Sequence, residues 1–402
     1  MDPLLNLVII NITTMKTLIT PLALAACLFA PSLSADYKPI PLEQGATAPD
    51  FELINVDDKK VTLADIRGEK ATAIIFTTNH CPDAIAAVGR TKELVATFAP
   101  QGVGFTAINS NSPKGLRLDE LRFSVYSDSF EDMKLVSQDS ELNHPYLYDG
   151  EDQKVAKAYG AVATPHIFIF DADLKLKYNG RIDDGRRSLG TAKKNEARDA
   201  LTAILAGEEP KVIKTRPIGC TTKWLEKAEA VAVSDKKWNS NPVTVETIDA
   251  ETVAKLVANE ANSTFRLFNV WSTTCGPCVA EFPDLAAIYK QYSLQKLEFI
   301  TISLDPAKDS EKVTEFLKEH YVGTSPGTQR LLKKDGRTTN NYLFQGDTED
   351  LAKALDAEWN GAMPHTLLVD KNGKVLYRHT GKIEPLDLKK SIVAEVWRLE
   401  AE

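Results

Sequence analysis

The chain contains two cysteines separated by two residues, in the motif Cys275-Gly276-Pro277-Cys278. An apolar, strand-like run over residues 265–271 ends in Trp271, a short polar turn follows, and a helical pattern begins at the motif. This order predicts that Cys275 stands at a helix N-terminus, where unpaired backbone N–H groups and the helix dipole stabilise a thiolate. Two thiols at this spacing can close a disulfide across the first helical turn, so the motif predicts redox chemistry.

Two other uses of this motif are a zinc site and an inert structural disulfide. A zinc site needs four ligands, and the sequence has no second C-x-x-C to supply the other half. The strand, turn and helix around the motif are more typical of a redox site than of an inert disulfide. We therefore expect redox chemistry, no metal and no cofactor.

The length of 402 residues predicts two domains. The hydrophobic content of 43% is ordinary for globular cores, and the net charge of −8 argues against nucleic-acid binding.

The first 35 residues form a pattern typical of a secretory signal, with Met15 as the expected true start. Lys16 precedes an apolar run over residues 17–30, and small residues at 32–35 offer a cleavage site. An uncleaved anchor over residues 4–34 is the alternative, which the polar residues within it weaken. The pattern predicts export to the periplasm or another extracytoplasmic compartment.

Residues 24–27 also resemble a bacterial lipoprotein box, in which Cys27 would carry a lipid. The apolar Leu28 and Phe29 favour ordinary cleavage further on, so we expect membrane attachment only if Cys27 is lipidated. The remaining cysteines are too few for a disulfide scaffold and are expected to carry chemistry.

The chain contains two copies of one plan. In each copy an apolar run leads to a cysteine, Cys81 or Cys275, and a helix-like segment follows. Pro165 follows Cys81 by 84 residues, and Pro364 follows Cys275 by 89. Both prolines begin a strand, turn and strand pattern with the same spacing of residues: Pro165, His166, Asp171, Lys175 and Tyr178 match Pro364, His365, Asp370, Lys374 and Tyr377.

Helix-like segments alternate with apolar strands through both copies, which predicts an α/β protein with a duplicated fold. We expect one domain over residues 43–213 and another over 243–402. The turn-rich stretch 214–242 is the expected linker, with a short helix at about 222–232.

The second half resembles the TlpA-like thiol–disulfide oxidoreductases of the thioredoxin superfamily. The resemblance rests on Trp271, the Cys-Gly-Pro-Cys motif, Glu281-Phe282-Pro283 and Met363-Pro364. It implies a central mixed β-sheet flanked by helices. It also implies that Pro364 is cis beside the dithiol, and that Met363 presents its backbone to an extended substrate peptide. Trp271 is expected to pack against this substrate-binding region.

The first half resembles the redoxin, or AhpC/TSA-like, branch of the same superfamily. Residues 48–53, the segment around Asn79-His80-Cys81-Pro82 and Thr164-Pro165 carry this resemblance. Two departures stand out. Ala84 occupies the place of a second cysteine, and Ile74 stands where a peroxidatic motif has proline.

The chemistry expected of the motif is thiol–disulfide exchange. As a thiolate, Cys275 would attack a disulfide in a protein client, and Cys278 would then attack Cys275 and release the reduced client. The Gly-Pro dipeptide resembles that of reducing thioredoxins, so we expect reduction, with a membrane thiol reductase as the electron donor. Glu281 either tunes the buried thiol or is a solvated helix residue, and the sequence leaves both open.

Cys81 is expected at a helix N-terminus, where a cationic His80 would lower its pKa. An inactive domain that retains one cysteine is the alternative. Cys220 either pairs with Cys81 as an accessory thiol or is a buried free thiol. His166 and His365 are interpreted as structural.

The leading functional hypothesis is an exported thiol–disulfide reductase acting through Cys275 and Cys278 on protein disulfide or dithiol clients. One alternative is a peroxidase-like first domain, in which Cys81 is oxidised and then recharged by the second domain. Another is a first domain that only docks a client. Ile74 favours docking over peroxidase activity.

Overall fold

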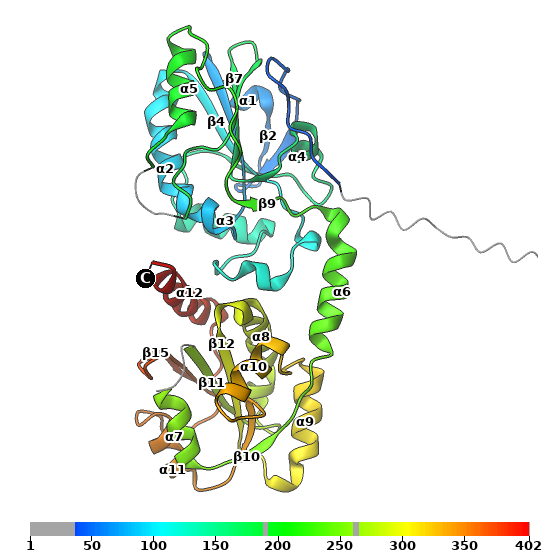
Figure 1. Cartoon of the computed structure of the whole chain (residues 1–402), viewed down its shortest axis with the longest axis vertical. Helices are drawn as coiled ribbons and strands as arrows, with labels where there is room; N and C mark the ends of the chain where they lie inside the picture. The colour runs from blue at the N-terminus through cyan, green and yellow to red at the C-terminus, as the bar shows by residue number, and fades with distance from the viewer. Residues whose placement is uncertain (1–36, 188–191, 260–264, 402) are drawn as a thin grey trace, which may run out of the picture. The chain divides into compact units, whose positions relative to one another are not determined.

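The computed structural model describes residues 37–187, 192–259 and 265–401 (Figure 1). The expected signal segment, with Met15 and Cys27, lies outside the described residues. Within these ranges, no helix is both long and apolar enough to cross a membrane.

The first domain is built on a seven-stranded mixed sheet in the order β2-β1-β5-β4-β3-β7-β8. The interior strand β3 runs parallel to β4 and antiparallel to β7. The strands are β1 (Glu52–Asn55), β2 (Lys60–Thr62), β3 (Ala71–Thr77), β4 (Val103–Asn109), β5 (Tyr146–Tyr148), β7 (His166–Asp171) and β8 (Leu176–Gly180). The helices are α1 (Leu63–Ile66), α2 (Pro82–Phe98), α3 (Phe130–Asp139), α4 (Lys154–Tyr159) and α5 (Glu196–Leu205).

Strand β3 is mostly apolar and is buried from Ala71 to Phe76 because both faces of the sheet are covered. Its alternate residues Ala73 and Ile75 belong to one core cluster with residues of α2 and α5. Ile74 and Phe76 point to the other face and belong to a cluster with α1 and α4.

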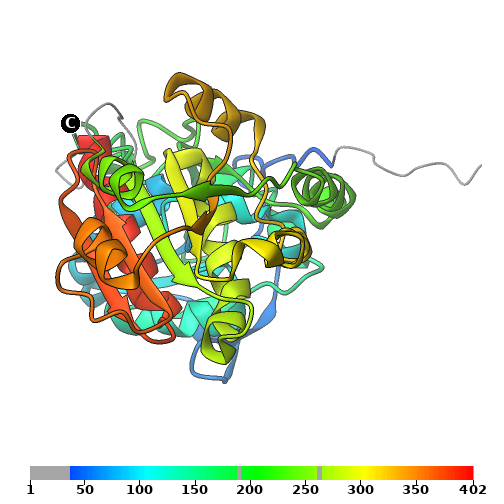
Figure 2. The same cartoon turned by 90° about the horizontal axis from the view of Figure 1, so that it is seen from below.

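The second domain has a six-stranded sheet in the order β10-β13-β12-β11-β14-β15, and helices lie on both of its faces (Figures 1 and 2). Its strands are β10 (Glu246–Ile248), β11 (Phe265–Trp271), β12 (Leu297–Ser303), β13 (Asn341–Phe344), β14 (His365–Val369) and β15 (Val375–Thr380). Its helices are α7 (Ala250–Ala258), α8 (Gly276–Tyr292), α9 (Ser310–Glu319), α10 (Pro326–Lys334), α11 (Thr348–Leu355) and α12 (Pro385–Ala401). The core on one face includes residues of α8, α9 and α12, and the core on the other face includes residues of α7 and α11.

The two domains repeat one arrangement. In each, a central strand leads into the long helix that follows the cysteine, and an antiparallel hairpin lies beside that strand: β3, α2, β7 and β8 correspond to β11, α8, β14 and β15. The Thr164–Pro165 and Met363–Pro364 peptide bonds, which precede the hairpins, are both cis. The expected α/β class with two mixed sheets flanked by helices is confirmed.

The stretch between the domains differs from expectation. The helix here is α6 (Ala228–Asn239), which begins and ends later than the expected 222–232, and a 3-10 turn, Leu225–Lys227, precedes it. The reason lies in the residues before it. Strand β9 (Cys220–Thr221) pairs antiparallel with β6 (Ala163–Thr164), and Trp224 is buried in a core cluster of the first domain. These residues are extended because they pack on the first domain.

Candidate active site

The Cys-Gly-Pro-Cys motif stands where the sequence predicts it, at the start of a helix. Cys275 is the N-cap of α8, and its Sγ accepts the backbone N–H of Cys278 at 3.3 Å. Proline in the first helical turn costs no hydrogen bond, since the N–H groups there have no helical partner. Cys275 is half-buried, Cys278 is fully buried, and a disulfide joins them.

Two further predicted residues lie around this disulfide. Trp271 is fully buried and packs on Phe282 and Phe316, with ring centroids 4.7 and 4.8 Å away. It therefore supports the motif from inside the core and offers no surface to a client. Met363 is half-buried, and both it and Cys275 pack against the core cluster that contains Trp271.

Glu281 lies on α8, one turn after Cys278, and its side chain is buried. Its Oε1 accepts the side-chain N–H of Asn269 and its Oε2 accepts the backbone N–H of Ile383, both at 2.9 Å. Burial raises the pKa of the Glu281 carboxyl, although both hydrogen bonds oppose the rise. The alternative of a solvated helix glutamate is wrong, because the side chain is enclosed.

Asp305 is a site residue that sequence reasoning missed. Its carboxylate accepts the backbone N–H of Thr273 at 2.8 Å and the hydroxyls of Thr273 and Ser272 at 2.6 and 3.2 Å. Burial would raise the pKa of Asp305, but these hydrogen bonds outweigh it and lower the pKa. Asp305 thereby fixes the turn that delivers Cys275. Its only sequence signal is its place just after β12, the strand beside β11.

Cys81 occupies the matching position in the first domain, as the N-cap of α2. Its side chain is fully buried, and its Sγ lies 3.1 Å from the carbonyl oxygen of Thr164. The backbone N–H of Cys220 donates to the same sulfur at 3.2 Å. Cys81 and Cys220 are both free thiols. The structure therefore places together, as free thiols, the two cysteines whose pairing the sequence left open.

A buried ion pair stands beside Cys81. His80 Nδ1 lies 2.7 Å from Asp128 Oδ2, and both side chains are at most 1% exposed. Asp128 also accepts the Thr78 hydroxyl at 2.6 Å, the Asn79 backbone N–H at 2.8 Å and an Asn111 side-chain N–H at 2.7 Å. Asp128 and Asn111 were missed because they are distant in sequence from the Cys81 motif.

The pKa values at this ion pair move in opposite directions. Burial disfavours both charges, but each partner stabilises the other, so the pKa of His80 is raised and that of Asp128 is lowered to about 2. Burial likewise disfavours a Cys81 thiolate. Hydrogen bonds from Cys220 and Ala84, together with the charge on His80, outweigh this and lower the pKa of Cys81 to about 6. Hydrogen bonding to Cys81 raises the pKa of Cys220.

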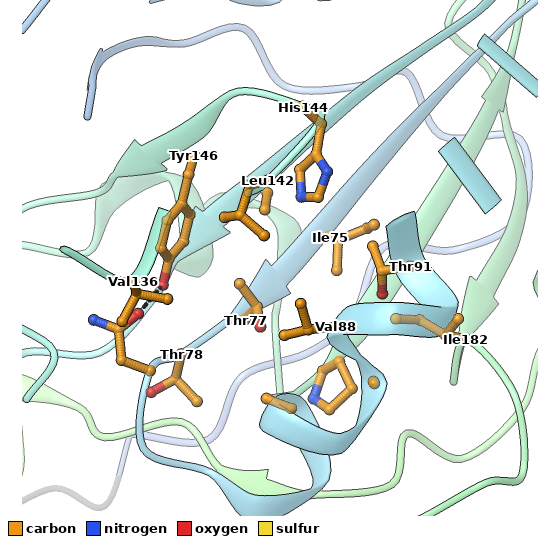
Figure 3. A pocket seen from close by; sticks show the side chains of 15 residues that line it. Ile75, Thr77, Thr78, Val88, Thr91, Val136, Leu142, His144, Tyr146 and Ile182 are labelled. Carbon is orange, nitrogen blue, oxygen red and sulfur yellow. Dashed lines mark hydrogen bonds between the residues drawn. The ribbon is translucent and has the colours of Figure 1, made fainter. Parts of the chain in front are cut away.

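A small cavity lies under the first turns of α2 (Figure 3). It measures about 40 Å³ and is lined by Thr78, Asn79, Tyr146 and Pro165 among others. Tyr146, labelled in Figure 3, is one of the lining residues, and its hydroxyl donates to Asn79 Oδ1 at 2.8 Å. Cys81 is not one of the lining residues, so this cavity does not expose its sulfur.

The two histidines after the prolines are both buried, at matched positions. Burial lowers the pKa of His166 to about 3 and also lowers that of His365, so both are neutral at pH 7. Among the described residues, no three His, Cys, Asp or Glu side chains gather as a metal site would require.

Both halves of the chain match known families. Residues 44–179 match the AhpC/TSA family, and residues 242–396 match the family described as Redoxin. The chain belongs to the thioredoxin superfamily. The superfamily resemblance predicted for each half is thereby confirmed.

The curated relatives that this chain matches include thiol–disulfide oxidoreductases. It is 28% identical to "Thiol-disulfide oxidoreductase ResA" of Geobacillus thermodenitrificans over 40% of this chain and 83% of that protein. It is 32% identical to "Thiol:disulfide interchange protein DsbE" of Escherichia coli K12 over 30% of this chain and 51% of that protein. For most of these relatives, including DsbE, the chain spans only about half of their length. The names of these relatives indicate redox activity for the family as a whole.

Two similar solved structures come from proteins without a stated activity. An uncharacterized conserved protein from Geobacillus kaustophilus is 39% identical over 47% of this chain and 95% of that chain, with a TM-score of 0.42. A hypothetical protein from Sinorhizobium meliloti 1021 is 30% identical over 46% and 97%, with a TM-score of 0.41.

Proposed function

We propose that this protein is an exported thiol–disulfide oxidoreductase that reduces protein disulfides through Cys275 and Cys278. The observation that carries the proposal is the asymmetry of this pair. Cys275 is partly exposed at the N-terminus of α8, Cys278 is buried one turn further in, and the two are close enough to be bonded. A partner can reach the first sulfur, and only the protein itself can reach the second.

The reaction is a two-electron exchange of one disulfide for another. The Cys275 thiolate attacks one sulfur of the client disulfide, and the client's other sulfur leaves as a thiolate that takes up a proton. Cys278 then loses its proton and attacks Cys275, which releases the second client thiol and leaves the Cys275–Cys278 disulfide. The client is reduced and the motif is oxidised.

Glu281 is the candidate proton acceptor for Cys278. The carboxyl is buried one helical turn from this thiol, and its pKa is raised, which brings it closer to the pH at which a general base works well. Asn269 and Ile383 hold both of its oxygens in place. Glu281 would thus assist the second step, in which the buried thiol must ionise.

The proposal includes a compartment and an electron source. Export follows from the signal pattern of residues 1–35, and a membrane thiol reductase would return the motif to the dithiol form. Cell fractionation with N-terminal analysis should find a chain that begins near Asp36, or at a lipidated Cys27. Recovery of the full-length chain from the cytoplasm would contradict export.

The activity is tested by reduction of insulin with dithiothreitol as electron source. The wild-type chain should accelerate insulin precipitation, and Cys275→Ser should abolish the acceleration. Ala280→Ser is the matched control, since it changes an exposed residue in the same part of α8 and should retain the activity. Equal activity of Cys275→Ser and the wild type would contradict the proposal.

A measurement of peroxide consumption distinguishes the two alternatives for the first domain. Peroxide consumption by the whole chain that is lost in Cys81→Ser would favour the peroxidase-like domain. Absence of peroxide consumption, combined with capture of a client by the first domain, would favour docking.

A further inference from the structure

In the first domain, a strand of the chain itself occupies the position that corresponds to the proposed client-binding backbone of the second domain. In the second domain this place is the backbone at Met363, which takes part in no strand pairing within the described part of the chain. Thr164 is the matching residue in the first domain, and strand β9 covers it, with Thr164 opposite Cys220 and Ala163 opposite Thr221. Cys220 therefore lies where a client cysteine would lie.

The pairing brings Cys220 to the Cys81 sulfur. The backbone nitrogen of Cys220 lies 3.2 Å from Cys81 Sγ, so the residue that carries the second thiol is in direct contact with the first sulfur. A disulfide requires the two sulfurs to approach to about 2.05 Å, and this contact places Cys220 where a small rearrangement can achieve it.

Gly219 makes this close approach feasible. A Cβ at this position would lie 1.9 Å from the carbonyl oxygen of Thr164. The φ angle of Gly219 is +143°, a value that residues with a side chain rarely adopt. Only glycine lets the chain pass this close to Thr164 and deliver Cys220 to the sulfur.

The surroundings divide the roles between the two thiols. The buried ion pair of His80 and Asp128 places a positive charge beside Cys81, and His80 Nε2 is buried with no hydrogen-bond partner among the described residues. This charge favours a Cys81 thiolate, which is the attacking form in a reaction between the two sulfurs. The arrangement is that of a buried nucleophile beside a partly exposed thiol.

We propose that Cys81 and Cys220 are a second redox pair that exchanges electrons with low-molecular-weight disulfides and not with protein clients. Strand β9 occupies the edge on which an extended peptide would pair, which excludes a protein client in this conformation. Cys81 is fully buried, so a small disulfide reaches the pair through Cys220, whose side chain is only partly buried. The proposal does not rest on the proposed function of Cys275 and Cys278.

The electron balance matches that of the first motif. The Cys220 thiol loses its proton and attacks one sulfur of a small disulfide, and the other half leaves as a thiolate and is protonated. The Cys81 thiolate then attacks Cys220 Sγ, and the second half leaves as a thiolate and takes up a proton. One small disulfide becomes two thiols, and Cys81 and Cys220 become a disulfide. An excess of the small thiol reverses both steps.

The test is a redox titration of the whole chain in glutathione buffers, followed by acid quenching, alkylation of the free thiols in denaturant and tryptic mapping. The sequence separates the two redox pairs cleanly. Cys81 falls in the tryptic peptide 71–90 and Cys220 in 215–223, whereas Cys275 and Cys278 share the peptide 267–290. We expect a cross-linked peptide of 71–90 with 215–223 that rises with the proportion of glutathione disulfide and disappears when reduced glutathione is restored.

Cys81→Ser supplies the second measurement. Without the buried thiol, the mixed disulfide of Cys220 with glutathione should accumulate, in a protein whose circular dichroism matches that of the wild type. If both thiols of the folded wild type remain fully alkylated at every glutathione ratio, the proposal is wrong. Cross-linking by hydrogen peroxide without any by glutathione disulfide would also overturn it, and would assign the pair to peroxide reduction.

Discussion

Asp128 Oδ2 lies 2.7 Å from His80 Nδ1, and neither side chain has appreciable contact with solvent. A buried ion pair contributes little net stability by itself, but removing one partner leaves the other charge unpaired. The pair is therefore expected to serve the neighbouring Cys81 thiolate, and its loss should be costly.

Asp128→Asn should lower the free energy of unfolding by about 3 kcal/mol, measured by urea denaturation. The pKa of Asp128 is lowered, so its contribution is present above the ordinary carboxyl pKa of about 4 and is lost as the pH falls toward about 2. The pKa of His80 is raised, so its contribution is complete below about 6.5 and is lost as the pH rises through the folded-state value. The difference in unfolding free energy between wild type and variant should be larger at pH 5.5 than at pH 9.

Asp152→Asn, at an exposed residue, is the control for Asp128→Asn. A difference that does not change with pH would contradict the ion pair.

Cys278→Ser should trap mixed disulfides with clients, because Cys275 can still attack and no second thiol releases the product. Cys275→Ser should trap none, since Cys278 is buried. Non-reducing gel electrophoresis followed by mass spectrometry would compare the two variants. Equal trapping by both would show that the roles of the two cysteines are not divided as proposed.

Glu281→Gln should slow release of the reduced client from the mixed disulfide by about 10²-fold near pH 7, which is the lower end of general-base effects. Quenched-flow sampling of the mixed disulfide would measure this step. Glu384→Gln, at an exposed residue next to Ile383, should leave the rate unchanged. An unchanged rate in Glu281→Gln would limit Glu281 to a structural role.

Glu281→Gln should also change how the stability of the protein depends on pH. The pKa of Glu281 is raised, so the folded state keeps the proton longer than the unfolded chain does. The wild type should therefore lose stability as the pH rises from the ordinary glutamate pKa of about 4.3 to the folded-state value, and Glu281→Gln should lack this loss. Urea denaturation of both proteins between pH 4 and pH 8 would measure it.

Gly219→Ala should displace β9 from Thr164 and suppress the Cys81–Cys220 cross-link. Gly207→Ala is the matched control, because that glycine also has a positive φ, of +76°, but has open space where the Cβ would be. The control should cost about 1 kcal/mol of unfolding free energy. Gly219→Ala should cost about 1–3 kcal/mol more, since its Cβ meets backbone. Equal costs, with the cross-link retained, would show that the fit at Gly219 is not tight.

The sequence predicts those parts of the site that are local. The run into Trp271, the motif and its helix are contiguous, as are β3, Cys81 and α2, and repetition of the plan predicted two similar domains. Asp128 and Asp305 were missed because each reaches the site from a loop after another strand, which no spacing rule encodes. The helix expected at 222–232 was misplaced because Cys220 and Trp224 make tertiary contacts that override local helix preference.

The position of β9 bears on how the chain should be divided. A fragment that stops at residue 213, the boundary expected from the sequence, would retain the whole seven-stranded sheet and lose Cys220. Its nucleophile would then face an open edge, and the fragment would gain a reactivity toward peptides that the intact protein withholds. A fragment extended through the 3-10 turn at Lys227 would keep the strand and its cysteine. Where the first domain is cut would therefore decide which chemistry is observed in it.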